Sequence, residues 1–181
     1  MDAVRVDLMA SAAGKVGGVT WHHLYLVATD AAGAQCYLRA GPQCLPVERL
    51  WRRRTQQGDA SDNYEPAPAG PYGAIAVSAG PYEPGAVDYD PVAANVPLAS
   101  AAAAAELWER VLGAAEALAA ENIAYDPAGK GANWALMEAL RRCGVQAARP
   151  PKRWAPGAGR LAPPIAVPGV SARRLGQAVA R

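Results

Sequence analysis

The segment "WHHLYLVATD", residues 21–30, constrains the fold more strongly than any other part of the chain. It is rich in aromatic and branched residues, a composition typical of a β-strand. The sequence "DAAGA" then provides a turn, and "QCYLRAGP", which ends at Pro42, runs back along it. This pattern predicts a β-hairpin, so the fold must contain an antiparallel sheet.

Two further segments are expected to be strands. "VRVDL", residues 4–8, alternates apolar and charged side chains, which is typical of a strand with one face exposed to solvent. "GAIAVSA", residues 73–79, lies between proline-containing turns and is also expected to be a strand. The small residues of "SAAGKVGG", residues 11–18, predict a loop.

Two helices follow later in the chain. The alanine-rich stretch 100–122 is expected to begin at Ser100, a good N-cap residue, and to bury a stripe of apolar side chains that comprises Leu107, Val111 and Leu118. A second helix is expected from Asn133 to Cys143, because Gly144 is a typical residue for a left-handed C-terminal stop. The predicted class is therefore α+β, an antiparallel sheet packed against at least two helices. Residues 1–160 are expected to form a single domain, and residues 161–181 a tail that contains proline and arginine.

Composition excludes several classes of protein. Of the 181 residues, 51% are hydrophobic and 19% charged, which is typical of a globular chain. The net charge is only +2, so we do not expect the protein to bind nucleic acid. There is no apolar run of membrane-spanning length and no ordinary signal peptide, so we expect a cytoplasmic protein. Secretion by a route that needs no signal peptide is the alternative. No cofactor or metal is expected, because the three cysteines lack the spacing of a metal site.

The candidate catalytic residues are two histidines and a cysteine. His22 and His23 are adjacent on the predicted strand, so they point to opposite faces, and only one of them can serve a given pocket as general base. Cys36 lies on the partner strand of the hairpin, and a nucleophile there could approach one of these histidines. The alternative is that both histidines are ordinary strand residues.

The junction "YDPAGKGANW", at the start of the second helix, is another place where a catalytic residue could lie. A helix N-terminus favours a thiolate, but the residues here are Gly131, Ala132, Asn133 and Trp134, and none is a nucleophile. Asn133 could instead cap the helix or stabilise an oxyanion.

A candidate binding surface comes from aromatic and basic residues between the hairpin and the first helix. It comprises Trp51, Arg52, Arg53, Tyr72 and Tyr82. Exposed aromatic side chains in irregular segments often serve recognition, although burial of these rings is equally ordinary in a chain without Phe.

The order of these motifs resembles the permuted papain-like superfamily, which includes NlpC-like peptidases and lecithin:retinol acyltransferase-like proteins. The residues that carry the resemblance are "HHLYLVATD", "AGP" at 40–42, "GANW" at 131–134 and "APG" at 155–157. The resemblance implies that His22 or His23 and Asn133 occupy site positions. It also implies a cysteine or serine at the start of the later helix, and this chain has none there.

Two functions are consistent with the sequence. The first is a non-catalytic binding protein on a papain-like scaffold, a bacterial effector or accessory protein whose partner is another protein or a peptide-like molecule. The second is a cysteine hydrolase or acyltransferase that acts on an amide or ester bond, with a strand histidine as base. The missing nucleophile favours the binding protein.

Overall fold

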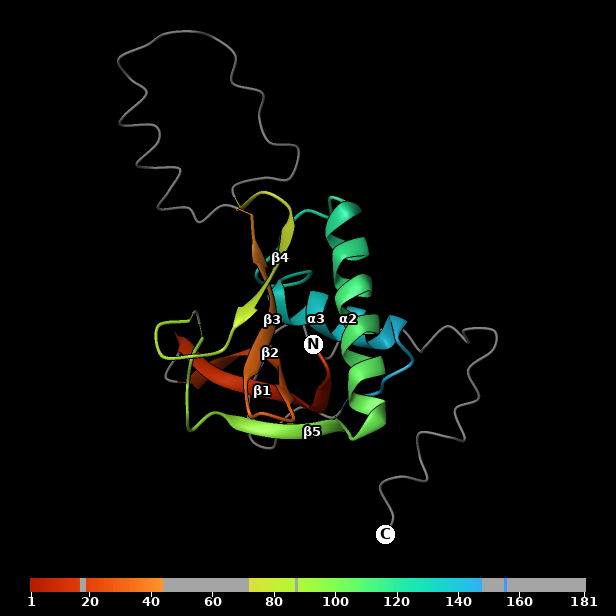
Figure 1. Ribbon diagram of the computed structural model, residues 1–181. Coiled ribbons are helices and arrows are strands. Elements are labelled where there is room, and N and C mark those ends of the chain that lie inside the picture. Colours follow the sequence, from red (N-terminus) through yellow and green to blue (C-terminus); the bar gives the residue numbers. More distant parts are fainter. Residues whose placement is uncertain (17–18, 44–71, 87, 148–154, 156–181) are drawn as a thin grey trace, which may run out of the picture.

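The structure is a computed structural model that describes residues 1–16, 19–43, 72–86, 88–147 and 155. Its five strands form one antiparallel sheet in the order β4-β3-β2-β1-β5 (Figure 1). The elements are β1 (Ala3–Val16), β2 (Val19–Asp30), β3 (Gln35–Pro42), β4 (Ile75–Pro81), β5 (Ala94–Ser100), α2 (Ala102–Ala120) and α3 (Ala132–Arg142). None of these helices is long and apolar enough to cross a bilayer.

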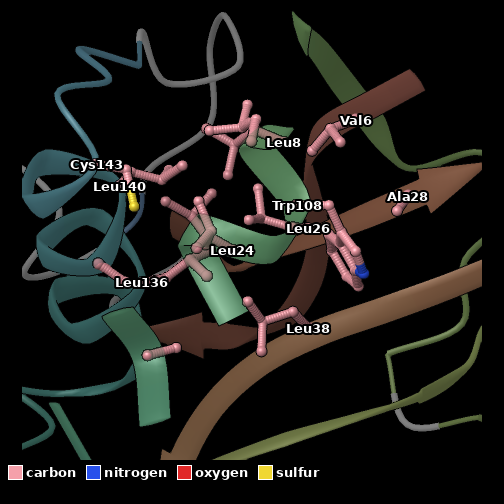
Figure 2. Close-up of a cluster of buried hydrophobic side chains, with 14 of the residues drawn as sticks. Val6, Leu8, Leu24, Leu26, Ala28, Leu38, Trp108, Leu136, Leu140 and Cys143 are labelled. Atoms are coloured by element: carbon pink, nitrogen blue, oxygen red, sulfur yellow. The ribbon is translucent and has the colours of Figure 1, made fainter. Parts of the chain in front are cut away.

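Both helices pack on one face of the sheet, which confirms the predicted α+β class. The main core consists of alternate residues of β1, β2 and β3 together with the apolar stripes of the helices (Figure 2). The predicted stripe residues of α2 and α3 are all buried, namely Leu107, Val111, Leu118, Leu136 and Leu140. Since Phe is absent, Trp108 of α2 is the largest side chain of this core.

The first strand is longer than predicted. Residues 11–16, expected to be part of a loop, continue β1 and pair with β2, for example Ser11 with His23. The register shifts between Ala12 and Gly14, as at a β-bulge. Pairing with the strongest strand of the chain therefore overrides the low strand propensity of these small residues.

The start of α2 also differs from the prediction. Ser100 does not cap the helix, because it is the last residue of β5 and pairs with Arg5 of β1. Ala101 makes the turn instead, with φ of 52°, and no side chain caps the helix. The strand β5 is not among the predicted elements; it contains Pro97, which is tolerated there because β5 is an edge strand.

The helix α3 ends as predicted and is joined to α2 by charged side chains. Gly144 has φ of 76°, the left-handed conformation expected of a C-terminal stop. Hydrogen bonds from Arg141, and then from Arg142, to Glu138 hold the pKa of that carboxyl below its usual value, although burial opposes this. Arg142 also pairs with Glu121, just after α2. This network connects the C-terminal end of α3 to the end of α2, while the N-terminal end of α3 lines the site described below.

The face of the sheet away from the helices carries a tyrosine cluster. Tyr25 of β2 packs there against Tyr82 and Tyr89, which belong to the segment that connects β4 with β5. The Tyr82 hydroxyl lies 2.9 Å from that of Tyr25 and also bonds both backbone groups of Asp90. Tyr82 is only 8% exposed, so its predicted place in a binding surface is wrong: the ring anchors this segment to the sheet.

Candidate functional site

The strands β2 and β3 pair along only part of their length. In the described residues their ladder runs from Leu26–Leu38 to Thr29–Gln35 and stops there, although both strands continue in the direction of His23. Past the ladder, the side chains of His23 and Asn133 form hydrogen bonds with backbone groups of β3 and β2 respectively. We call this region the split.

Asn133 bridges the split from α3. Its Oδ1 accepts a hydrogen bond of 2.8 Å from the backbone N–H of Leu24, and its Nδ2 donates one of 3.0 Å to the backbone carbonyl of His22. The side chain is only 5% exposed. It thus supplies to β2 the donor and acceptor that a neighbouring strand would otherwise supply. The expected role as a helix cap is wrong, because Gly131 is the N-cap residue and no side chain caps α3.

His23 joins β2 to two other segments. Its Nε2 lies 3.1 Å from the backbone carbonyl oxygen of Ala40 on β3, and its Nδ1 lies 2.7 Å from Oδ2 of Asp88. The same carboxylate oxygen lies 3.3 Å from Nε of Arg39. Asp88 comes from the segment between β4 and β5 and has φ of 66°, a left-handed conformation that Asp tolerates better than most residues.

Acceptors surround both nitrogens of the His23 ring. One is the backbone carbonyl of Ala40, which can only accept a hydrogen bond, and the other is the carboxylate of Asp88. Burial alone would raise the pKa of the Asp88 carboxyl, but the hydrogen bond from His23 and the charges of His23 and Arg39 hold it below its usual value. Both ring nitrogens of His23 are thus engaged within the protein, so neither is free to act on a guest as general base in this arrangement.

A cavity of about 690 Å³ opens at the split. Its aromatic wall is formed by Trp21, Tyr72 and Tyr125, and the last two rings have centroids 5.7 Å apart. The ionisable part of the wall is formed by His23, Arg39 and Asp88. The remainder comes from the start of α3 and small residues, namely Ala13, Gly41, Pro42, Pro127, Ala128, Gly131, Ala132 and Asn133. A volume of this size is typical of pockets for drug-sized ligands.

Tyr125 connects the aromatic wall to α3. Burial raises the pKa of its hydroxyl, against the opposing effects of a hydrogen bond from the backbone of Ala132 and the charge of Arg39. The hydroxyl therefore stays protonated at neutral pH and can donate a hydrogen bond into the site.

The loop 126–131 fixes the start of α3. The Asp126 side chain accepts a hydrogen bond from the backbone N–H of Ala128, and the backbone N–H of Asp126 donates to the carbonyl of Lys130. Gly131 passes so close to this loop that a Cβ there would lie 2.9 Å from the backbone oxygen of Asp126. The absence of a side chain at this position is thus a condition for the compact loop.

We expect Gly131→Ala to lower the free energy of unfolding by about 1–3 kcal/mol, because the added methyl group forces the loop backbone to move. Gly113→Ala is the matched control: Gly113 lies in α2, where a Cβ would meet nothing within 4 Å. The control should be stabilising by up to about 1 kcal/mol, since alanine is the better helix former. Urea denaturation of both variants measures the difference, and equal effects would contradict this account of the loop.

The structure brings together some of the predicted site residues and separates others. His23, Tyr72 and Asn133 all line the cavity. His22 is on the opposite face of β2 from His23, as predicted from strand alternation, and is buried on the side of the helices. Trp51, Arg52 and Arg53 lie outside the described residues.

The structure does not bring Cys36 near either histidine. Cys36 pairs with Ala28, five positions from His23, and this corresponds to about 17 Å along the strand. Its side chain packs against the core on the helix side. Cys143 is also a core residue, and burial raises the pKa of its thiol despite the nearby Arg110. The described part of the chain therefore offers no paired cysteine and histidine.

Four important residues of the cavity were not predicted. Trp21 and Arg39 had a usable signal, since Trp21 shares a strand face with His23 and Arg39 is a charged residue inside an otherwise apolar strand. Asp88 and Tyr125 had none, because each comes from an irregular segment whose path the sequence pattern does not define.

Comparisons with protein-family models, curated protein sequences and solved structures find no match to this chain.

Proposed function

We propose that this protein is a non-catalytic binding protein that takes an aromatic group of a peptide-like ligand into the cavity at the split. The observation that carries the proposal is the wall of Trp21, Tyr72 and Tyr125 around a volume of about 690 Å³. Aromatic rings stack favourably on one another and bury a large apolar area, so they suit a planar apolar guest. The few polar groups beside them can orient that guest.

The chemistry of the wall supports binding rather than catalysis. Among the described residues that line the cavity there is no cysteine, serine or threonine. The histidine of the wall uses both ring nitrogens in hydrogen bonds to acceptors. A binding role on a permuted papain-like scaffold, in a bacterial effector or accessory protein, is the function we propose from the sequence resemblance together with this wall.

The proposal is tested with N-acetyl-phenylalaninamide, a neutral aromatic peptide mimic, titrated into the protein and followed by NMR. We expect saturable shifts of the Trp21 indole N–H signal. Ala128→Trp should reduce the affinity at least about tenfold, because Ala128 is exposed at the cavity wall and an indole there fills the space of the guest.

The matched control is Ala31→Trp, which places the same side chain on an exposed turn between β2 and β3, beyond the far end of the ladder. It should bind like the unaltered protein. Absence of saturable binding to the unaltered protein, or equal binding to all three proteins, would refute the proposed site.

A further inference from the structure

The cavity wall carries a guanidinium that shares its carboxylate partner. Among the described residues that line the cavity, Arg39 is always cationic and Asp88 is the one acidic residue. The carboxylate oxygen Oδ2 of Asp88 contacts both Nε of Arg39 and Nδ1 of His23, so Arg39 does not have this oxygen to itself. The Arg39 side chain is only 21% exposed, and a guanidinium that is partly removed from water and incompletely paired favours an anionic guest.

The geometry of Arg39 indicates which part of the wall receives this anion. Its Nε faces Asp88, whereas its Nη2 lies over Gly41, 3.4 Å from the position that a Cβ there would take. Among the described residues no hydrogen bond or ion pair engages the two Nη groups, and this terminal edge of the guanidinium is the fork that pairs with a carboxylate through two parallel hydrogen bonds.

Two neighbouring features add to the same effect. The N-terminal end of α3, at Gly131 and Ala132, also lines the cavity, and a helix N-terminus carries partial positive charge. No acidic side chain occupies the first turn of this helix. The neutral hydroxyl of Tyr125 can donate a further hydrogen bond to an anion.

We infer that the guest is an aromatic carboxylate, with its ring between Trp21, Tyr72 and Tyr125 and its carboxylate on the terminal edge of Arg39. This inference rests on the proposed function and adds the charge of the ligand to it. The same chemistry is present in a free aromatic acid and in the C-terminal residue of a peptide that ends in an aromatic amino acid.

The test compares acids with their amides, which have the same shape and no charge. The probes are 3-phenylpropanoate with 3-phenylpropanamide, and N-acetyl-Ala-Ala-Phe as free acid and as amide, each titrated by calorimetry. A hydrogen-bonded charge pair is expected to make each acid about tenfold to a hundredfold tighter than its amide. A larger preference in the tripeptide pair indicates a peptide C-terminus, and a larger preference in the phenylpropanoate pair indicates a free acid.

Arg39→Gln should lower the affinity for the acids to that for the amides and leave the affinity for the amides unchanged. Arg110→Gln, which removes the same charge from α2 away from the cavity, should keep the preference for acids. If Arg39→Gln does not fold, Arg39→Lys keeps the charge without the planar fork and should retain only part of the preference.

The outcomes separate the two proposals. Equal affinity of acid and amide for the unaltered protein overturns the carboxylate inference and leaves the proposed aromatic site intact. A preference for acids that persists in Arg39→Gln also overturns it. Absence of binding by acids and amides alike overturns the proposed function together with the inference.

Discussion

Replacement of Asn133 by alanine is expected to lower the free energy of unfolding by about 3 kcal/mol. The substitution removes both partners that the side chain provides to β2, and leaves the backbone N–H of Leu24 and the carbonyl of His22 without them. Each buried backbone group left unsatisfied costs about 1–3 kcal/mol. Water from the adjacent cavity can hydrogen-bond to these groups and offset part of the cost. We therefore expect a loss within the summed range of the two groups.

Urea denaturation, followed by circular dichroism, measures this effect. Asn95→Ala is the matched control, because Asn95 is exposed on the edge strand β5. The control should change the free energy of unfolding by no more than about 0.5 kcal/mol. Equal losses in the two variants would contradict the bridging role of Asn133. Tenfold weaker binding of the aromatic probes by Asn133→Ala would accompany the loss, because the split would no longer be held at a fixed width.

Replacement of Asp88 by asparagine is expected to lower the free energy of unfolding by about 2 kcal/mol at neutral pH. It removes the carboxylate that His23 and Arg39 share, and partial exposure of the Asp88 side chain reduces the cost from that of a fully buried pair. Asparagine tolerates a positive φ, so the backbone of the segment should be kept. Asp90→Asn is the control, since among the described residues the Asp90 carboxylate accepts one hydrogen bond, an exposed one from the backbone N–H of nearby Val92.

The Asp88→Asn effect should depend on pH with a defined sign. The pKa of Asp88 is lower in the folded protein than in the unfolded chain, so its carboxylate stabilises the fold above the unfolded value of about 4. That stabilisation is lost as the pH falls through the lower pKa of the folded state. The difference between the unaltered protein and Asp88→Asn should therefore shrink below pH of about 4 in a series of urea denaturations. A difference that stays constant down to pH of about 2 would contradict a lowered pKa of Asp88 in the folded protein.

The periodic elements of this fold were predictable from the sequence. The hairpin is confirmed as β2 and β3, and the two helices bury the apolar stripes that their spacing predicts. Each of these elements has a strong local pattern that agrees with its final environment. The continuation of β1 through residues 11–16 and the strand β5 have weak local patterns, and only their partners in the sheet make them strands.

The site was much less predictable, because its key contacts join distant parts of the sequence. The adjacent histidines were recognised as candidates, but no local pattern indicates that Asp88 approaches His23 or that Asn133 bonds to the strand that carries it. The cavity exists because β2 and β3 separate, and a sequence pattern that predicts two paired strands gives no sign of where their pairing stops.

The bridge through Asn133 also determines when the cavity can form during folding. Its bonds to β2 close over 109 and 111 positions of the chain, whereas the hairpin of β2 and β3 needs only a short turn. Contacts of such long sequence separation carry a high loop-closure entropy and tend to form slowly. During synthesis β2 leaves the ribosome long before α3 does, and its backbone groups at the split remain hydrated in the meantime. We therefore expect docking of α3 to complete the cavity as a late step of folding, so that a chain that has formed only the sheet has no finished cavity.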